Sequence, residues 1–493
     1  MYSFKKLFQF LFVVVATVAV GQSGLTVLAP TFPDQTHIRY LIETPVRNPY
    51  DLTRLSRWLV QKNFDVAGMD WRNGRVEVIT SSAGVQYLNS QGLKGQEIHE
   101  TGPDGQPLLA PDSKYLNPQT AVQKMQAINQ AFPQLTHLEQ IGTSLQGRPI
   151  MALLISETPN PADPKYLEKP SIIFDAEHHA REIMTPEIVM DVAEVMLKSF
   201  RTSREAASIL HNWNIWLVPM VNPDGSNIVF TKDSMWRKNA RGSASSVFGV
   251  DINRNYTYRW AGCNGSSSNS GAQDYHGASA GSEPETQALM KFAQKVLPTA
   301  SLSYHSYSEF VLYPYGCQNT FTSEKVMVAD IANQMASRLP SDSKKGNYTP
   351  GTPWQLLYDV DGDSMDFMYA SFGALSYTFE INQDFQPPYT MRDPTVMKHR
   401  NAWQYFLARI DQNLLTVNVV DGKSGQPGLA LINIDTISHP NGELPFRTNA
   451  TGHYFKVLDP GHYTIAAKLQ DGRTGQVGVD MKGQPQKVVL TIQ

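Results

Sequence analysis

Cysteine is the scarcest residue of this 493-residue chain, which contains only Cys263 and Cys317. Two cysteines allow at most one internal disulfide, which excludes a small fold held together by several bridges. Excess charge of either sign is also missing, because 42 basic and 45 acidic residues leave a net charge of −3. This balance gives no reason to expect nucleic acid or an anionic membrane as a partner.

The sequence also lacks an apolar run long enough to cross a bilayer. The longest run, residues 7–20, follows Lys5 and Lys6 and overlaps Ala19-Val20-Gly21, a small-x-small cleavage pattern. We therefore expect residues 1–21 to be a signal peptide, and the protein to be secreted or periplasmic with no transmembrane segment after its removal. The alternative is an uncleaved anchor, which would need about 20 apolar residues.

The chain is too long for one average core, so several domains are expected. Residues 36–102 alternate between strand and helix patterns, which predicts a small α+β unit. Its expected strands are residues 37–44 and 76–81, and its expected helices are residues 51–63 and 84–93. Residues 102–113 are rich in Gly, Pro and Asp, which predicts an exposed linker.

From about residue 115 to residue 412, strands alternate with long helices. Near-continuous apolar runs predict strands buried on both faces at residues 170–176, 214–221, 300–307 and 374–381. Helices are predicted at residues 186–200, 282–296, 323–339 and 394–412. The predicted fold class is α/β, with a mixed twisted sheet sandwiched by helices. Helical patterning stops at residue 413, and short strands separated by turn residues predict a small β-sandwich over residues 413–493.

Three side chains that are far apart in the sequence form the donor set of a zinc hydrolase. His179 and Glu182 follow a buried strand, and His305 lies in another strand. Zinc in hydrolases takes three protein ligands and leaves a fourth position for water. Glu380 ends a further buried strand and is free to be the base that this water needs. A His and a Glu at this spacing alone are more often ordinary loop and helix-start residues, but the combination favours one Zn²⁺ per chain.

Several motifs occur in the order of a known family. With HAREIMTPE, VNPDG, MWRKNAR, GVDINRNY and SYHSYSEFVLYPYG, residues 115–412 resemble zinc metallocarboxypeptidases of the carboxypeptidase A/B type, which are funnel-mouthed α/β exopeptidases. The resemblance implies hydrolysis of the C-terminal bond of peptides and proteins. It also implies that residues 22–114 are an inhibitory prosegment with its linker, so that the protein is a zymogen. Residues 413–493 resemble a transthyretin-like sandwich.

The resemblance also implies roles for residues around the metal. Glu380 matches the general base that activates the zinc-bound water. Asp251 matches the carboxylate that accepts the second ring N–H of the first zinc histidine and so orients it. Arg237 matches the residue that stabilises the oxyanion as the substrate carbonyl becomes tetrahedral. Adjacent to the first ligand, His178 has no acidic residue three positions on, and we expect it outside the ligand set.

Four further residues match substrate-binding positions of the family. Asn253 and Arg254 correspond to the clamp for the free C-terminal carboxylate, which a planar guanidinium can bind through two hydrogen bonds. Tyr358 corresponds to the tyrosine that closes over this clamp. Tyr369 lies nearer Glu380 in the sequence but does not match. Arg181 resembles a secondary substrate contact.

The specificity pocket implied by the resemblance has Met365 at its floor, with Leu312, Gly316 and Val360 as walls. These side chains are apolar or small, so a hydrophobic C-terminal residue would gain about 1.5–3 kcal/mol. Asp363 complicates this expectation, because in an extended segment its side chain would share a face with Met365. A carboxylate there would favour Lys or Arg, although Asp is also typical of a turn. We expect broad specificity with a hydrophobic preference, with a basic preference as the alternative.

Two other functions stay open at this stage. A catalytically inactive binding scaffold is disfavoured because the ligands, base and clamp are all retained, and a zinc assay would exclude it. An amidase acting on modified or cell-wall peptides would be expected to depart from the clamp at Asn253 and Arg254, and no departure is found. The sequence leaves open the pairing of Cys263 with Cys317, the natural substrate and the oligomeric state.

Overall fold

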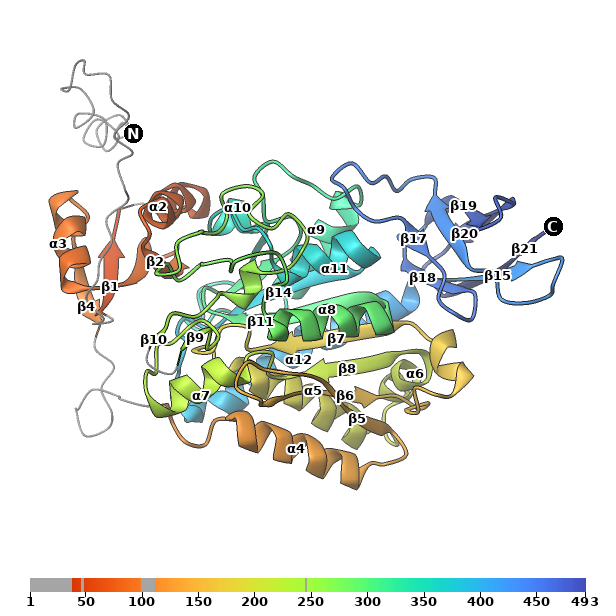
Figure 1. The fold of residues 1–493 in the computed structure, drawn as a ribbon, viewed down its shortest axis with the longest axis horizontal. Helices are drawn as coiled ribbons and strands as arrows, with labels where there is room; N and C mark the ends of the chain where they lie inside the picture. Colours follow the sequence, from red (N-terminus) through yellow and green to blue (C-terminus); the bar gives the residue numbers. More distant parts are fainter. Residues whose placement is uncertain (1–37, 46–47, 99–110, 244–245) are drawn as a thin grey trace, which may run out of the picture.

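The computed structural model describes residues 38–45, 48–98, 111–243 and 246–493. The expected signal peptide, residues 1–21, and most of the expected linker lie outside these ranges. A small N-terminal unit, a central α/β body and a strand-rich C-terminal unit follow one another along the long axis of the molecule (Figure 1). The N-terminal and C-terminal units therefore contact opposite ends of the central body.

The N-terminal unit is a four-stranded antiparallel sheet with two helices. The sheet has the order β2-β3-β1-β4. The side chains of Asn48 and Ser81 cap the first turns of the two helices, which the sequence predicted. Two of the strands, β2 and β4, were not predicted. The elements are β1 (Ile38–Glu43), α2 (Pro49–Gln61), β2 (Asp65–Asp70), β3 (Arg75–Thr80), α3 (Ser82–Ser90) and β4 (Gly95–Ile98).

The central body contains an eight-stranded mixed sheet of order β13-β12-β14-β11-β7-β8-β6-β5. Its four middle strands, β14, β11, β7 and β8, are parallel and almost wholly buried, as their apolar sequences predicted. The strands are β5 (Thr136–Thr143), β6 (Pro149–Ile155), β7 (Ser171–Ala176), β8 (Asn214–Val218), β11 (Pro298–Ser306), β12 (Phe310–Leu312), β13 (Thr349–Gly351) and β14 (Leu375–Ile381).

Helices cover both faces of this sheet, which confirms the predicted α/β class. One face packs against α4 (Pro118–Ala131), α5 (Thr185–Ser199), α6 (Arg204–Asn212), α9 (Lys325–Ala336) and α12 (Arg392–Gln412). The other face packs against α8 (Pro284–Val296) and α11 (Ser364–Phe372). Two shorter helices, α7 (Pro223–Thr231) and α10 (Pro353–Leu356), and a small hairpin, β9 (Gly242–Ser243) with β10 (Ser246–Val247), lie in the connections.

The C-terminal unit consists of two sheets around a separate apolar core, as the sequence predicted. One sheet has the order β18-β15-β21 and the other has the order β17-β16-β19-β20. The strands are β15 (Leu414–Asp421), β16 (Ala430–Ile434), β17 (Phe446–Arg447), β18 (His453–Val457), β19 (Gly461–Leu469), β20 (Thr474–Met481) and β21 (Gln486–Ile492). In β16 buried and exposed residues alternate, because one face of the strand packs on this core.

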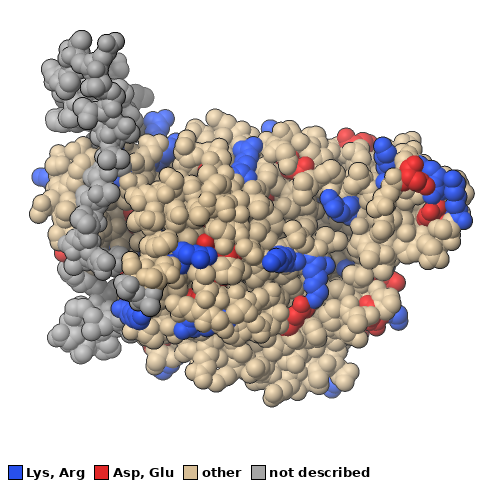
Figure 2. Space-filling model, in the orientation of Figure 1, with Lys and Arg blue, Asp and Glu red and all other residues tan. Residues whose placement is uncertain are grey.

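Cys263 and Cys317 form a disulfide, with 5.9 Å between their Cα atoms, which settles a pairing that the sequence left open. Acidic and basic side chains are interspersed over the face of the molecule seen in Figure 2. Within the described ranges, every helix is either too short or too polar to serve as a membrane span.

Candidate metal centre and active site

The candidate metal ligands come together because they lie at the same edge of the central sheet. Strand β7 ends at Ala176, and the turn that follows it carries His179 and Glu182 before α5 begins. His305 lies near the end of the neighbouring parallel strand β11. In the register of β11 with β14, it is paired with Glu380. The carboxyl ends of parallel strands are where α/β folds place their sites.

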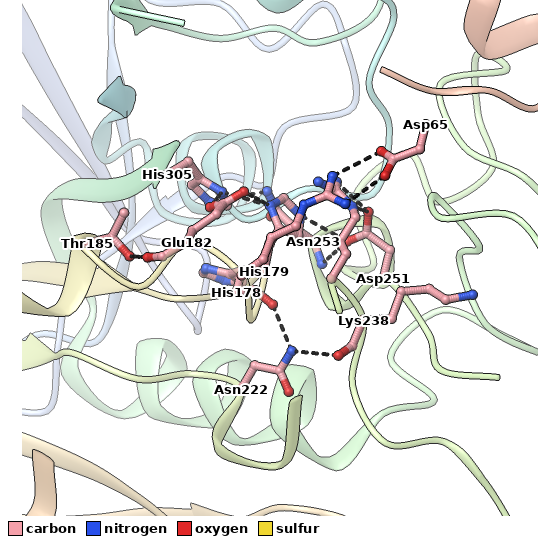
Figure 3. A network of polar contacts seen from close by, with 12 residues as sticks. Asp65, His178, His179, Glu182, Thr185, Asn222, Lys238, Asp251, Asn253 and His305 are labelled. Carbon is pink, nitrogen blue, oxygen red and sulfur yellow. Dashed lines mark hydrogen bonds and ion pairs between the residues drawn. The ribbon is translucent and has the colours of Figure 1, made fainter. Parts of the chain in front are cut away.

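His179, Glu182 and His305 are buried and present ligand atoms that all lie within 4.8 Å of one another (Figure 3). His179 Nδ1 is 2.8 Å from Glu182 Oε1 and 3.1 Å from His305 Nδ1. The second carboxylate oxygen, Glu182 Oε2, is 3.0 Å from His305 Nδ1. Two ring nitrogens and a carboxylate therefore converge on one point, where a metal ion would satisfy all three.

The outer nitrogens of both histidines face polar partners. His179 Nε2 lies 3.2 Å from Asp251 Oδ1, and His305 Nε2 lies 3.5 Å from Asn253 Nδ2. A carboxylate such as Asp251, which can accept the Nε2 proton of His179, fixes the orientation of that ring and leaves its Nδ1 to the metal. The donor set and its surroundings fit Zn²⁺, and the predicted pairing of His179 with Asp251 agrees with the geometry.

Asp251 also connects the metal centre to Arg237. The Arg237 guanidinium donates to Asp251 Oδ2 from both Nε and Nη2, at 3.2 and 2.7 Å. Burial alone would raise the pKa of Asp251, but the charges of Arg237, His179 and Arg254 hold it well below its ordinary value. The aspartate is therefore an anion that fixes both the first histidine and the arginine expected to face the oxyanion.

A cavity opens beside the candidate metal ligands and is lined in part by His179 and Glu182. Arg254 and Asn253 line this cavity as well. Arg254 donates from Nε to the carbonyl of Gly265 at 3.2 Å and from Nη1 to the carbonyl of Asn253 at 2.8 Å. Its Nη2 has no hydrogen bond within the described part of the chain. The Asn253 side-chain oxygen accepts from Ser364 N, at 2.9 Å. Both predicted clamp residues are therefore held by backbone groups and line the cavity.

Glu380 and Tyr358 line this cavity as well. Burial and the negative charge of Glu182 raise the pKa of Glu380 well above its ordinary value, against the opposing charges of Arg237 and Arg254. Tyr369 donates to Glu324 at 3.0 Å and is outside the cavity lining, in agreement with the choice of Tyr358. The structure thus brings all of the predicted catalytic and clamp residues to one cavity.

Most of the residues predicted to form the specificity pocket line the cavity, but the backbone that carries Met365 has a different conformation from the one predicted. Met365, Leu312 and Val360 line the cavity, whereas Gly316 lies behind Val360 and accepts a hydrogen bond from its backbone N–H. The expectation that Asp363 and Met365 lie in an extended segment was wrong, because Met365 is in the first turn of α11. Asp363 caps that helix by accepting from Asp366 N at 3.0 Å, and it also lines the cavity.

The N-terminal unit covers the cavity, a contact that the sequence did not reveal in residue detail. Arg181 forms two hydrogen bonds with Asp65 of β2, at 2.6 and 3.0 Å. Val66 and Ala67, the next residues of β2, line the cavity itself. The remaining space is about 50 Å³, enough for a few water molecules but not for a peptide residue. Nothing in the pattern DVAGMD distinguishes these residues from an ordinary strand.

His178 lies outside the ligand set, as predicted, but it is not a surface residue. Its ring is fully buried and stacks on His305, with 5.4 Å between ring centroids. His178 Nε2 lies 2.8 Å from the Tyr256 hydroxyl. The side chain packs beneath the metal centre, where its ring supports the position of His305.

Comparisons with known proteins agree with this geometry. Metallocarboxypeptidase A of Trichophyton rubrum is 31% identical over 273 residues, which span 52% of this chain and 62% of that protein. Carboxypeptidase A2 of Mus musculus is 32% identical over 266 residues, which span 52% of this chain and 60% of that protein. The matched region is thus less than two thirds of either relative.

The fold also has a counterpart among solved structures. The crystal structure of carboxypeptidase A from Helicoverpa armigera superposes with a TM-score of 0.61, at 21% identity, over 75% of this chain and 95% of that one. The sequence profile of the zinc carboxypeptidase family matches residues 121–402, more than half of the chain. These residues include every predicted metal ligand, the base and the clamp. The chain belongs to the zinc carboxypeptidase family.

Proposed function

We propose that this protein is a zinc-dependent exopeptidase that removes the C-terminal residue of peptides and proteins. The observation that carries the proposal is the convergence of a metal-ligand set, a carboxylate base and an arginine clamp on one cavity. Family membership and the similarity to proteins named carboxypeptidase A support it. No observation favours an inactive scaffold or an amidase.

In this proposal the metal ligands and the base have distinct roles. When bound by His179, Glu182 and His305, zinc would supply Lewis-acid polarisation and lower the pKa of water. Glu380 accepts a proton from the attacking water and delivers it to the leaving amine.

The two arginines bind the two negative charges of the reacting substrate, which are the developing oxyanion and the C-terminal carboxylate. Arg237, fixed by Asp251, faces the carbonyl oxygen as negative charge develops on it. Arg254 and Asn253 bind the free carboxylate, and Tyr358 covers it. The clamp requires a free C-terminal carboxylate on the substrate. This requirement makes the enzyme an exopeptidase, because an internal peptide bond offers no such anion to the clamp.

The proposal is tested by incubating one peptide in two forms, as the free acid and as the C-terminal amide, and identifying products by mass spectrometry. The free acid should lose residues from its C-terminus one at a time, and a chelator should stop the reaction. Internal cleavage, or equal rates for the acid and the amide, would contradict an exopeptidase.

We further propose that the N-terminal unit is an inhibitory prosegment, that the catalytic domain spans residues 115–412, and that the protein is exported. Asp65 forms an ion pair with Arg181, while Val66 and Ala67 line the cavity that a substrate would enter. The disulfide between Cys263 and Cys317 supports an oxidising compartment.

Cutting the chain within the expected linker, residues 102–113, should therefore increase its peptidase activity, once the N-terminal unit can dissociate. Asp65→Ala should partly activate even the uncut chain, because breaking a buried charge pair costs about 2–5 kcal/mol of docking free energy. Glu43→Ala is the matched control, since it breaks only an exposed ion pair with Arg75 inside the same unit. An uncut wild-type chain that is as active as the cut one would refute latency.

We propose that the pocket accepts hydrophobic C-terminal residues and, as the pH rises, also basic ones. Met365, Leu312 and Val360 offer apolar surface. Asp363 adds a carboxylate whose Oδ2 has no hydrogen-bond partner among the residues that the structure describes. Burial raises the pKa of Asp363 to about 6, an effect opposed by the hydrogen bond from Asp366 N and the charge of Arg254 and increased by Asp361.

The ratio of kcat/KM for a Lys-terminated peptide to that for a Phe-terminated peptide should therefore rise between about pH 5 and pH 7.5. The sign follows because a carboxyl with a raised pKa stays neutral at the acidic end and gains its charge as the pH passes that value. Asp363→Asn should remove the slope while keeping the helix cap, since Asn caps as well as Asp. A ratio in the wild type that does not change with pH would contradict the assignment.

A further inference from the structure

The C-terminal sandwich contacts the central body through a loop that lies behind the specificity pocket. This sandwich loop, residues 441–445, leads into β17. Glu443, only 9% exposed, accepts a hydrogen bond from the Tyr315 hydroxyl at 2.7 Å. Its other carboxylate oxygen accepts from Asn441 N at 2.7 Å, which holds the carboxylate in place. Tyr258 adds a second link by donating to the Asn441 carbonyl at 2.9 Å.

Tyr315, the partner of Glu443, is fully buried and packs against other aromatic rings. It stacks on Tyr258 and meets Tyr369 edge-on, with 5.5 Å between ring centroids in each case. The next residue, Gly316, donates its N–H to Asp366 of α11 at 2.9 Å. Its carbonyl accepts from the backbone N–H of Val360 at 3.1 Å.

Val360 is the point at which this chain of contacts reaches the substrate cavity. Gly316 and Val360 are in close contact, because a Cβ at position 316 would lie 2.5 Å from the Val360 carbonyl oxygen. A small shift of the segment around Tyr315 would therefore move the pocket wall. The sandwich loop also holds α11, since Leu444 N donates to the Ala370 carbonyl at 2.7 Å. Helix α11 carries Met365 in its first turn.

We propose that Glu443 of the C-terminal sandwich is a positioning residue for the specificity pocket, acting through Tyr315 on the wall residue Val360. The sandwich thereby influences which C-terminal residue the catalytic domain accepts. The effect on substrate choice rests on the proposed exopeptidase function, whereas the effect of Glu443 on the position of Val360 depends only on the contacts described above.

Hydrogen exchange tests whether Glu443 holds Val360 in position, and it needs no substrate. In Glu443→Ala the backbone N–H of Val360 should exchange faster than in the wild type, because its acceptor, the Gly316 carbonyl, follows Tyr315, which loses its hydrogen bond to the sandwich loop. Tyr315→Phe keeps the ring but loses the donated hydrogen bond, so the Val360 N–H should exchange faster in this variant as well. Glu443→Gln should lie between the wild type and Glu443→Ala, since its amide oxygen can still accept from Tyr315 while its NH2 cannot accept from Asn441 N.

Kinetics of the linker-cleaved chain test the effect on substrate choice. Glu443→Ala and Tyr315→Phe should raise KM for Phe-terminated peptides about three- to tenfold, the scale of one hydrogen bond, with a smaller change in kcat. The ratio of kcat/KM between Phe-terminated and Ala-terminated peptides should fall, and Glu443→Gln should restore part of it. Asp459→Asn is the matched control, because Asp459 links the same sandwich to Arg409 of α12, away from the pocket.

An unchanged Val360 exchange rate in Glu443→Ala would overturn the proposal. So would a change in KM that Asp459→Asn reproduces, because the effect would then be a general loss of sandwich docking. If the wild-type chain cleaved no peptide, the exopeptidase function would fail, while the exchange rates would still decide whether Glu443 positions Val360.

Discussion

Replacing Glu380 by Gln should leave the metal in place and abolish nearly all turnover. The amide is almost the same size as the carboxylate but cannot accept a proton from the attacking water. General base catalysis contributes roughly 10²–10⁴-fold to rate, so kcat should fall by that factor while KM changes little. Steady-state kinetics with a free-acid peptide, combined with metal analysis of the same preparation, would measure both quantities.

A second buried glutamate controls for nonspecific effects of this substitution. Glu285 of α8 is fully buried and accepts hydrogen bonds from Leu145 N and Asn239 rather than from a cavity residue. Glu285→Gln should keep kcat near the wild-type value. If Glu380→Gln retained most of its kcat with a full complement of zinc, Glu380 would have to be a structural residue.

Replacing Arg254 by Ala should weaken hydrolysis of free-acid peptides about 30-fold or more. The guanidinium is buried beside the cavity, and losing one partner of a buried charge pair costs about 2–5 kcal/mol. The loss should appear mainly as a higher KM, because the substrate carboxylate is bound before and during the reaction. Arg254→Lys should recover only part of it, since an ammonium lacks the planar fork.

Amidating the substrate tests the same interaction without changing the protein. The wild-type enzyme should lose a similar factor on the amide, and the Arg254→Ala variant should discriminate little between acid and amide. Arg400→Ala serves as the control, because Arg400 pairs with Asp191 at a distance from the cavity residues. Strong discrimination that persists in Arg254→Ala would assign the clamp to another residue.

The predicted features that the structure confirms are those with strong local signals. The four central strands are continuous apolar runs, and their ends fix where His179, His305 and Glu380 can lie. Helix α11 was missed because its sequence, SMDFMYASF, follows a turn-like run of Asp and Gly and is buried on nearly all sides. Such a helix has no polar stripe, so periodicity does not identify it.

Contacts between distant parts of the chain could not be predicted from local patterns. Asp65 lies in a short strand with no periodicity, and its partner Arg181 is 116 positions further along the chain. Glu443 and Tyr315 are separated by 128 positions and come from different units. Pairings of this kind depend on how whole units pack, which neither propensity nor spacing encodes.

The zinc requirement of peptide hydrolysis is the most direct test of the proposed metal centre. The linker-cleaved chain would be stripped with a chelator, and zinc would be added back in measured steps while release of the C-terminal residue is followed. Activity should vanish on stripping and return in proportion to added zinc, reaching its maximum at one equivalent per chain, and His305→Ala should recover neither zinc nor activity. Hydrolysis that survives complete removal of the metal, or a full equivalent of zinc bound in His305→Ala, would contradict the account.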